Sequence, residues 1–463
     1  MAKQDNNEIK SVFRHLMLYV SRDIKKSYLL TEALQNYFPQ HPQSIIQTIL
    51  ESDYGLIFDE IIAEIIKHSL EDSQAVELDQ LIPDETNILR FTAVQSSLRC
   101  IGYYSNLKST NTSIKLIESW QNYAQRLSDI GKHQEAITAS AQAVALSRLL
   151  QQDKNNYQQA SILLADNLEH LSDNLSNIGH NIAAIAAARE ALQLLQSDHL
   201  NQHKGNCCKT AYIFTALAAL YMDNEQTQEA LQSAQAATEI HKLCENNTHT
   251  ISQCHHTHTY CLKNQGLILA ETFHIDQFIE TITKATRLCR VLVKYNRQFR
   301  DELAQSLELQ AIAYWAINNK NALNIARKQA FAIQMELTRE QPDSYYIDTA
   351  NTMLKKAGIL SNNEHHDEAK KLANLAQEAF QDLCILYEDA HSPDLVNVLI
   401  SKAQIYTASG NFKTALQDIK QAIHRLKRLC QTYPKVDSYV QKLTTCQNIK
   451  KTITKKIKET SPA

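Results

Sequence analysis

One stretch of the chain, from Trp120 to Leu149, carries two helical segments separated by a glycine, and its pattern returns downstream. In the first segment, apolar and small residues recur at spacings of three and four, which places them on one helical face: Trp120, Tyr123, Ala124 and Leu127. Gly131 ends this segment, because glycine adopts the left-handed conformation after a helix without a Cβ penalty. The second segment resumes with Ala136, Ala143 and Leu149. The stretch therefore predicts a helical hairpin with small residues where its helices touch.

The small residue near the start of the second helix recurs at intervals of 44 to 48 residues. It falls at Ala136, Ala184, Ala230, near Phe278, near Ala322, at Ala369 and at Ala415. The fourth and fifth hairpins are the least regular, since Phe278 replaces a small residue and the alignment around Ala322 can slip by one. The sequence predicts seven hairpins, with helix starts at the prolines Pro342 and Pro393 between the later ones.

The sequence of this repeat, for example NYAQRLSDIGKHQEA at 122–136, resembles the tetratricopeptide repeat family, in its long-period bacterial form of about 46–48 residues. Ser140 departs from the family pattern, which has an aromatic residue there. The resemblance covers about 114–432. It implies an all-α fold, a right-handed α-α superhelical solenoid of helical hairpins, in which the first helices line a concave groove that binds proteins or peptides.

Residues 1–113 do not show the repeat and predict a helical bundle, with KSTNTS at 108–113 as a linker. This region holds fifteen Asp and Glu against ten Lys and Arg. It is interpreted as a solvated cap on the array, with a helical effector or adaptor module as the alternative.

Residues 433–463 predict a basic capping helix with a tail. Its apolar stripe comprises Val440, Leu443, Cys446, Ile449, Ile453 and Ile457. The other face carries seven lysines between Lys435 and Lys458. We interpret that face as solvated; a docking surface for an acidic partner or nucleic acid is the alternative.

Composition supports a helical, non-nucleic-acid-binding chain. Of 463 residues only 8 are Gly and 7 are Pro, and the net charge of −3 disfavours phosphate binding as the main activity. The sequence shows no secretory signal and no apolar span of membrane length. It therefore predicts a cytoplasmic protein whose ten cysteines are reduced and packed as small apolar residues.

Catalytic motifs are missing from the sequence. It contains no G-x-x-x-x-G-K-[ST], no G-x-S-x-G and no H-E-x-x-H, so we expect neither an enzyme nor a cofactor. The run at 244–261 offers weak candidates for a metal site, because helical spacing brings part of it to one face: Cys244, Cys254, His258 and Cys261. An ordinary junction between hairpins, without metal, is the preferred interpretation.

The resemblance also implies which residues face the groove. They are Gln121 and Gln125, then Asp166, Glu169 and Asp173, then Tyr212 and Thr215, then Tyr260 and Lys263, and further along Asn351, Leu354, Asn397 and Gln404. Three carboxylates on successive turns favour a partner segment that carries Lys or Arg, although exposed pairs contribute only about 0–1 kcal/mol each. A solvated groove edge is the alternative.

The sequence thus predicts a non-enzymatic protein-interaction scaffold or regulatory subunit that binds a protein segment. Two other hypotheses remain open. One is a ligand-sensing signalling receptor whose amino-terminal bundle is the effector module. The other is an accessory subunit of a peptidase or ATPase complex.

Overall fold

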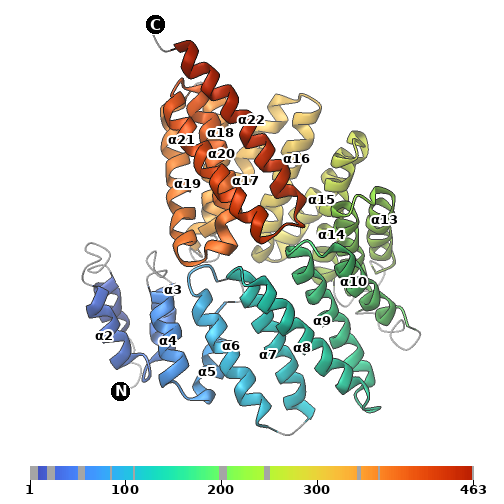
Figure 1. Cartoon of the computed structure of the whole chain (residues 1–463). Coiled ribbons are helices and arrows are strands. Elements are labelled where there is room, and N and C mark those ends of the chain that lie inside the picture. Colours follow the sequence, from blue (N-terminus) through green and yellow to red (C-terminus); the bar gives the residue numbers. More distant parts are fainter. Residues whose placement is uncertain are drawn as a thin grey trace. The chain divides into compact units, whose positions relative to one another are not determined.

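The computed structural model describes residues 9–17, 27–50, 58–83, 86–107, 110–197, 206–244, 251–340, 346–362 and 365–460. Within these ranges all regular elements are helices (Figure 1). Contacts divide the chain into two compact units. Unit 1 joins residues 1–139 to 338–463, and unit 2 comprises residues 140–337. The expected division into 1–113, 114–432 and 433–463 follows the repeat pattern and not these contacts, so it stays a prediction.

The helices before the repeats are short. They are α2 (Ser27–Tyr37), α3 (Pro42–Leu50), α4 (Asp59–Ser69), α5 (Asp72–Asp79) and α6 (Arg90–Ser105). They enclose one apolar core that includes Phe13, Leu34, Phe38, Ile62 and Ile66. These residues are fully or almost fully buried because the isoleucines, leucines and phenylalanines recur at helical spacing.

Seven helical hairpins follow, as the sequence predicts (Figure 1). Their paired helices are α7 (Thr110–Asp129) with α8 (His133–Gln151), α9 (Tyr157–Asn177) with α10 (Asn181–Leu195), α12 (Asn206–Asp223) with α13 (Thr227–Cys244), α14 (Ile251–Glu271) with α15 (Ile275–Tyr295), α16 (Arg300–Ala316) with α17 (Lys320–Glu340), α18 (Tyr346–Asn362) with α19 (His366–Leu386), and α20 (Glu388–Ala408) with α21 (Phe412–Thr432). A short 3-10 turn, Arg297–Phe299, precedes α16, and α22 (Asp437–Thr460) ends the described chain. The expected all-α repeat fold is confirmed.

The same turn closes each hairpin. A backbone N–H three positions past the first helix donates to the carbonyl five residues earlier, at 2.8–3.0 Å in all seven turns, for example Lys132 N to Leu127 O. The residue before that donor is left-handed in the six turns whose backbone is described there. It is glycine at Gly131, Gly179 and Gly410 (φ 75–81°), but Glu225, Phe273 and Asn318 adopt the same conformation at φ 55–61°. Turn geometry is thus kept even where the sequence lacks the glycine signal.

Small residues on the first helix also recur in register, seven residues before the turn. They are Ala124, Ser172, Ala218, Gly266, Ala311, Ala357 and Ala403, and all are buried. In the second hairpin the Ser172 hydroxyl donates to the carbonyl of Ala184 at 2.9 Å, so the helices touch at this level. A small residue on the first helix is thus common to all seven hairpins, whereas the facing position on the second helix is small in only five of them.

The fourth hairpin shows how Phe278 is accommodated. Its ring is buried at the position that is Ala136 in the first hairpin, and the facing residue is Gly266. A Cβ atom on Gly266 would lie 2.4 Å from Cδ1 of Ile282 and 3.5 Å from the Phe278 ring. A larger residue on one helix is thus matched by the smallest residue on the other.

In the fifth hairpin Leu323 takes the position expected near Ala322, within the slip of one residue that the sequence allowed, since its N–H bonds to Asn319 O as Ala136 N bonds to Lys132 O. Two expectations about element ends need correction. Helix α20 begins at Glu388, so Pro393 lies inside it; Glu388 and Asp389 suit the positive helix start better. Helix α7 begins at Thr110, within the expected linker. The expected start at Pro342 lies outside the described residues.

Helix α22 packs on α20 and α21 through much of its expected apolar stripe. Cys446 and Ile453 are fully buried, and Ile449 and Ile457 pack beside Ile419 of α21. Val440 differs from the expectation, because its side chain is 48% exposed. The buried part of the apolar stripe therefore begins about one helical turn later in α22 than the sequence suggested.

Within unit 1, the short helices are joined to the first hairpin by a buried ion pair. Arg126 of α7 is 4% exposed and its guanidinium pairs with Asp79 of α5. The same Nη1 donates to Ser97 Oγ at 2.7 Å and to Ala93 O at 2.9 Å on α6. A buried charge needs such partners, because an unpaired one would cost several kcal/mol, on the order of 3–5.

A second buried network joins α4 and α6 to the α19–α20 junction. Asp59 is completely buried, and its carboxylate accepts the N–H groups of Phe91 and Thr92, both at 2.7 Å, and the hydroxyl of Tyr387. Those two N–H groups belong to the first turn of α6, so Asp59 caps a neighbouring helix. Burial raises the pKa of Asp59 to about 6, against the opposing effect of the Tyr387, Thr92 and Phe91 hydrogen bonds.

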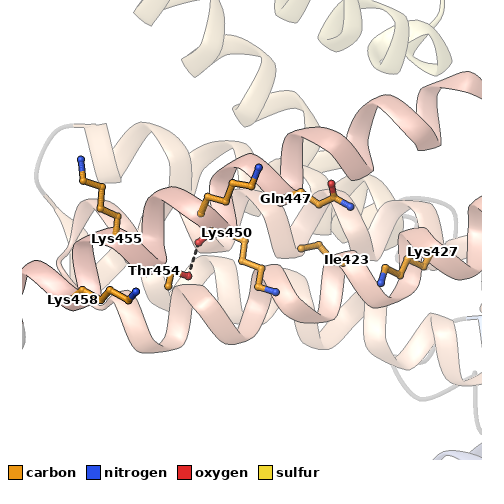
Figure 2. Close-up of a pocket in the computed structure, with 8 residues that line it drawn as sticks. Ile423, Lys427, Gln447, Lys450, Thr454, Lys455 and Lys458 are labelled. Atoms are coloured by element: carbon orange, nitrogen blue, oxygen red, sulfur yellow. Dashed lines mark hydrogen bonds between the residues drawn. The ribbon is translucent and has the colours of Figure 1, made fainter.

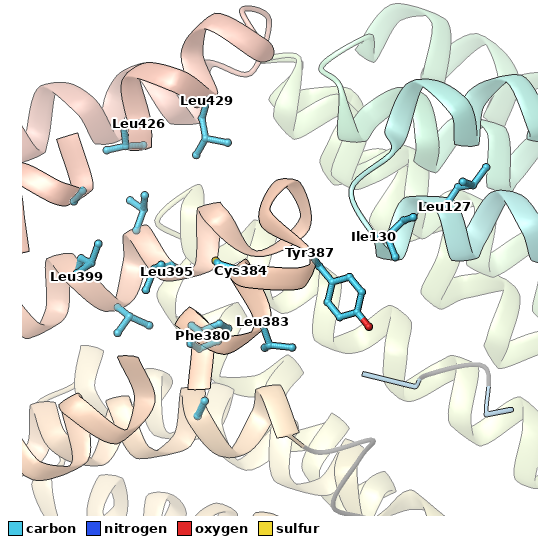
Figure 3. Packing of buried hydrophobic residues seen from close by; sticks show 14 of the residues in the cluster. Leu127, Ile130, Phe380, Leu383, Cys384, Tyr387, Leu395, Leu399, Leu426 and Leu429 are labelled. Atoms are coloured by element: carbon cyan, nitrogen blue, oxygen red, sulfur yellow. The ribbon is translucent and has the colours of Figure 1, made fainter. Parts of the chain in front are cut away.

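Tyr387 lies between two parts of unit 1 that are far apart in the sequence (Figure 3). Its ring contacts Phe91 at a centroid distance of 5.0 Å. Nearby, Arg90 Nη1 donates to Asp129 O at 2.6 Å and lies 2.6 Å from His391 Nε2. A Cβ atom on Gly131 would lie 2.5 Å from the backbone N of Ala390, so the turn of the first hairpin packs directly on the start of α20. The first and last hairpins of the array therefore share one core.

The cysteines are reduced in the described part of the chain, where eight are free thiols. Five of them are buried: Cys100, Cys261, Cys289, Cys384 and Cys446. Burial is the main reason that the pKa of these thiols is raised, to about 12 at Cys100 and about 11 at Cys261 and Cys384. None of the described helices is long and apolar enough to cross a membrane.

Candidate functional site: a polar face on the first helices of unit 2

The first helices of consecutive hairpins in unit 2 present a continuous polar face. We call it the acid–tyrosine face and define it by Asp166, Glu169 and Asp173 on α9, Lys209 and Tyr212 on α12, and Tyr260 on α14. These positions are spaced by three or four residues on each helix, so they share one side of it. The structure thus brings together five of the residues that the sequence assigned to a groove.

The carboxylates of this face are not three independent negative charges. Asp166 forms an ion pair with Lys209 of the next hairpin. Glu169 is 8% exposed, and its carboxyl group is hydrogen-bonded to that of Asp173. Burial, followed by the nearby charge of Asp173, raises the pKa of Glu169 well above its ordinary value.

Because the pKa of Glu169 is raised and its carboxyl group is hydrogen-bonded to that of Asp173, the pair can hold one proton between the two groups. Burial raises the pKa of Asp173 as well, although this residue keeps a solvent-exposed side. The neighbouring His170 is neutral in this setting, because burial lowers the pKa of its imidazole. Its Nε2 lies 3.9 Å from Glu169 Oε2. The face carries less negative charge than its residue types suggest.

Two tyrosines continue the face beside these carboxyl groups. The rings of Tyr212 and Tyr260 are stacked, with centroids 5.0 Å apart and planes inclined by 15°. Their hydroxyls are hydrogen-bonded to each other, and burial together with the Glu169 charge raises the pKa of Tyr212. Tyr212 is 38% exposed, so one ring surface is open to a binding partner.

Thr215 and Lys263 differ from the expectation that they face a partner. Thr215 is 2% exposed, and its hydroxyl donates to Ala211 O at 2.9 Å and lies 3.2 Å from Cys261 Sγ. Lys263 is 8% exposed, and its Nζ donates to Gln305 Oε1 at 2.7 Å, while burial lowers its pKa. Both side chains pack one hairpin against the next, which leaves them little surface for a ligand.

The remaining expected groove residues belong to unit 1. Gln125 donates to Asp129 Oδ1 at 3.0 Å, and Asn397 accepts from Lys442 Nζ at 3.0 Å. Gln404 is exposed, whereas Gln121 and Asn351 are partly buried. Leu354 is a core residue, because it packs beside Ala357 and Ala369. The structure does not bring these side chains into a cluster comparable to the acid–tyrosine face.

The candidate metal ligands are only partly described. The side chains of Cys244 and Cys254 lie outside the described residues. His258 and Cys261 are buried in α14, where the Cys261 thiol is held protonated by burial and donates to Ala211 O at 3.8 Å. Among the described residues no three potential ligands come together. The weak candidate site is therefore not assembled by the described residues.

Two features of the face were missed at the sequence level. Lys209 lies three residues before Tyr212, and this helical spacing could have identified it. The raised pKa of Glu169 could not have been foreseen, because it depends on how deeply this residue is buried by residues of other helices.

Comparison with known proteins finds structures of similar fold but no protein that is similar in sequence. No protein-family model matches the sequence, and no curated protein matches it. The apo form of the quorum sensor NprR from B. thuringiensis is similar in structure, with TM-score 0.50 and 11% identity over 88% of this chain and 99% of that one. Aspartyl phosphate phosphatase F from Bacillus subtilis aligns with TM-score 0.46 and 13% identity over 82% of this chain and 90% of that one.

A Rap protein complexed with competence and sporulation factor aligns with TM-score 0.41 and 13% identity, over 86% of this chain and 99% of that one. At such identities the likeness concerns the fold alone. The likeness to NprR agrees with the all-helical array of hairpins in this chain. The chain therefore has the fold of the tetratricopeptide repeat family, as an all-α array of long-period helical hairpins.

Proposed function

We propose that this chain is a non-enzymatic interaction scaffold or regulatory subunit that binds a segment of a partner protein on the acid–tyrosine face. The observation that carries the proposal is the combination on one face of a buried, hydrogen-bonded carboxyl pair, an exposed stacked tyrosine and an ion pair. Tyrosine is enriched at protein interfaces because it offers a large apolar ring with a polar end. The similar structure of the quorum sensor NprR is compatible with this role.

The partner segment should carry a lysine or arginine. A cation placed between Glu169 and Asp173 would replace the proton that these groups share, so both carboxylates could be ionised and paired. The tyrosine rings beside them can contact the aliphatic part of the same side chain. The rest of the array supplies length for a longer segment but no comparable cluster.

Replacing the shared proton makes binding depend on pH. The groups that face the pair are His170 and Asp166 on the same helix, Lys209 and Tyr212 on α12, and Tyr260 on α14. Since binding releases a proton, affinity should rise with pH through the raised pKa of Glu169. Lys209 stays paired with Asp166 and needs no rearrangement.

The test is affinity capture of the tagged full chain from its native cells, followed by mass spectrometry. The face variant is Glu169→Gln/Asp173→Asn, which keeps side-chain size and hydrogen bonding while removing the exchangeable charge. The matched control is Glu239→Gln/Glu280→Gln, two exposed carboxylates on α13 and α15 with the same change in charge. A partner that the control retains and the face variant loses supports the proposal. A partner retained by the face variant, or lost equally by both, contradicts it.

A further inference from the structure

The carboxyl-terminal helices carry a concentration of positive charge that the acid–tyrosine face does not explain. Residues 412–460 contain twelve Lys and Arg against three Asp and Glu, a net of +9 in a chain whose total is −3. Neighbouring acids neutralise part of this charge: Glu388 pairs with Arg425 and Arg428, and Asp418 lies 3.6 Å from Lys402. Most of the lysines of α22 are exposed.

Five lysines line one groove between α21 and α22 (Figure 2). We call this the lysine groove: Lys427 comes from α21, and Lys450, Lys451, Lys455 and Lys458 come from α22. Its volume is about 570 Å³. In the described part of the chain, no ion pair involves Lys427, Lys450, Lys451 or Lys458.

The groove also has an apolar floor and fixed polar neighbours. Ile423 of α21 lies at its base, half-buried, and packs beside Ile419 and Ile453. The Thr454 hydroxyl donates to Lys450 O at 2.8 Å, so it is used within α22. The groove therefore offers ammonium groups along its sides and one apolar contact between them.

We propose that the lysine groove is a docking site for an acidic segment of a partner protein. The spacing of the lysines is compatible with such a segment: along α22 the rise is about 6 Å from Lys451 to Lys455 and about 4.5 Å from Lys455 to Lys458. Alternate residues of an extended peptide lie about 6.6 Å apart, and the long, flexible lysine side chains can take up the difference. Acidic residues at every second position of the peptide could pair with Lys451, Lys455 and Lys458, while the peptide residues between them contact Ile423. Several weak pairs together would hold the segment, and long-range attraction would speed its arrival.

A nucleic acid fits this groove less well. All its charges are lysines, which act as point charges and do not hold phosphates in the two-bond geometry that arginine offers. None of its lining residues is aromatic, so bases would have no ring on which to stack. The residues of the groove therefore favour an acidic peptide over a nucleic acid as the partner. This surface is made of residues different from those of the proposed function, and its test is independent.

The experiment measures fluorescence anisotropy with the full chain at low salt. The probe is a labelled peptide with Glu at every second position around a central Leu, and the same peptide with Gln in place of Glu is the negative control. The groove variant is Lys427→Gln/Lys451→Gln/Lys458→Gln. The control variant, Lys284→Gln/Lys328→Gln/Lys371→Gln, removes three exposed lysines from second helices of other hairpins and changes the net charge equally.

We expect the Glu peptide to bind the wild type and the Gln peptide not to bind. The groove variant should bind about tenfold more weakly, and the control variant should stay within about twofold. The corresponding Lys→Arg variant should bind like the wild type, which separates charge from folding. Equal losses in groove and control variants, no binding of the Glu peptide, or tighter binding of single-stranded RNA or duplex DNA that the groove variant abolishes would each overturn the proposal.

Discussion

Removing a single hydroxyl group tests how unit 1 is held together. In Tyr387→Phe the ring remains, so its contacts with Phe91 and with the surrounding apolar cluster are kept. What is lost is the hydrogen bond to the buried carboxylate of Asp59, together with the longer one, 3.3 Å, that the hydroxyl accepts from the Arg90 N–H. A hydrogen bond to a charged group contributes about 1.5–3 kcal/mol, and we expect the variant to be destabilised by about 2 kcal/mol near pH 8. That corresponds to a Tm lower by roughly 2–4 °C for a chain of this size.

The size of this loss should depend on pH. Because the folded pKa of Asp59, about 6, lies above its ordinary value of 3.8, the folded state binds the extra proton. The contribution of Asp59 to stability is therefore greatest below pH 3.8 and falls as pH rises through about 6. The Tyr387 hydroxyl opposes that fall, since it stabilises the ionised form. Its removal should cost about 2 kcal/mol at pH 8 but nearer 1 kcal/mol at pH 5, where a neutral hydrogen bond is lost.

The assay is thermal unfolding followed by circular dichroism at several pH values, with hydrogen exchange of the Phe91 and Thr92 amides as a local readout. The matched control is Tyr433→Phe, a half-buried tyrosine of the same cluster whose hydroxyl makes no hydrogen bond in the described part of the structure. A loss below about 0.5 kcal/mol at pH 8, or the same loss at pH 5 and pH 8, would refute the reasoning.

Three further predictions concern the hairpins, and thermal unfolding checks each. Gly131→Ala should cost more than Gly410→Ala: both residues are left-handed, which costs an alanine about 1–2 kcal/mol, but only at Gly131 would the new Cβ meet backbone, the Ala390 N at 2.5 Å. Equal losses would show that the turn does not pack on α20. Phe273→Gly should raise stability by about 0.5–1 kcal/mol, because Phe273 is left-handed and 87% exposed, whereas Phe273→Ala should bring no such gain. Gly266→Ala should destabilise by about 1–3 kcal/mol through contact with Ile282 Cδ1, and Ile282→Val, which removes that atom, should recover part of the loss in the double variant. Additive losses would mean that the two residues do not compete for space.

Local periodicity was enough to predict the hairpins. Small residues mark the points where the two helices of a hairpin touch, at Ala136, Ala184, Ala230, Ala369 and Ala415. The two helices of one hairpin lie within about 40 residues of sequence, so the need for a small residue is visible in a local pattern. Phe278 shows where the rule is incomplete, since its acceptance depends on Gly266 across the hairpin. A pattern confined to one helix does not reveal such compensation.

Long-range contacts could not be predicted. The bond from Tyr387 to Asp59 joins residues 328 positions apart, and no local pattern marks either of them. The same limit applies to the candidate site. Asp166, Glu169 and Asp173 were identified by spacing, but their charge state depends on burial and on Lys209. Thr215 and Lys263 were assigned to the surface because spacing gives the direction of a side chain and not what covers it.

The buried thiols make the chain its own reporter of local opening. Cys100 lies in α6, Cys261 and Cys289 in the fourth hairpin, Cys384 in α19 and Cys446 in α22. Because each is buried with a raised pKa, little thiolate is present and a soluble alkylating reagent cannot reach it without a local opening. The labelling rate at each cysteine, resolved by mass spectrometry, should therefore measure how often its own hairpin or helix opens, without any introduced label.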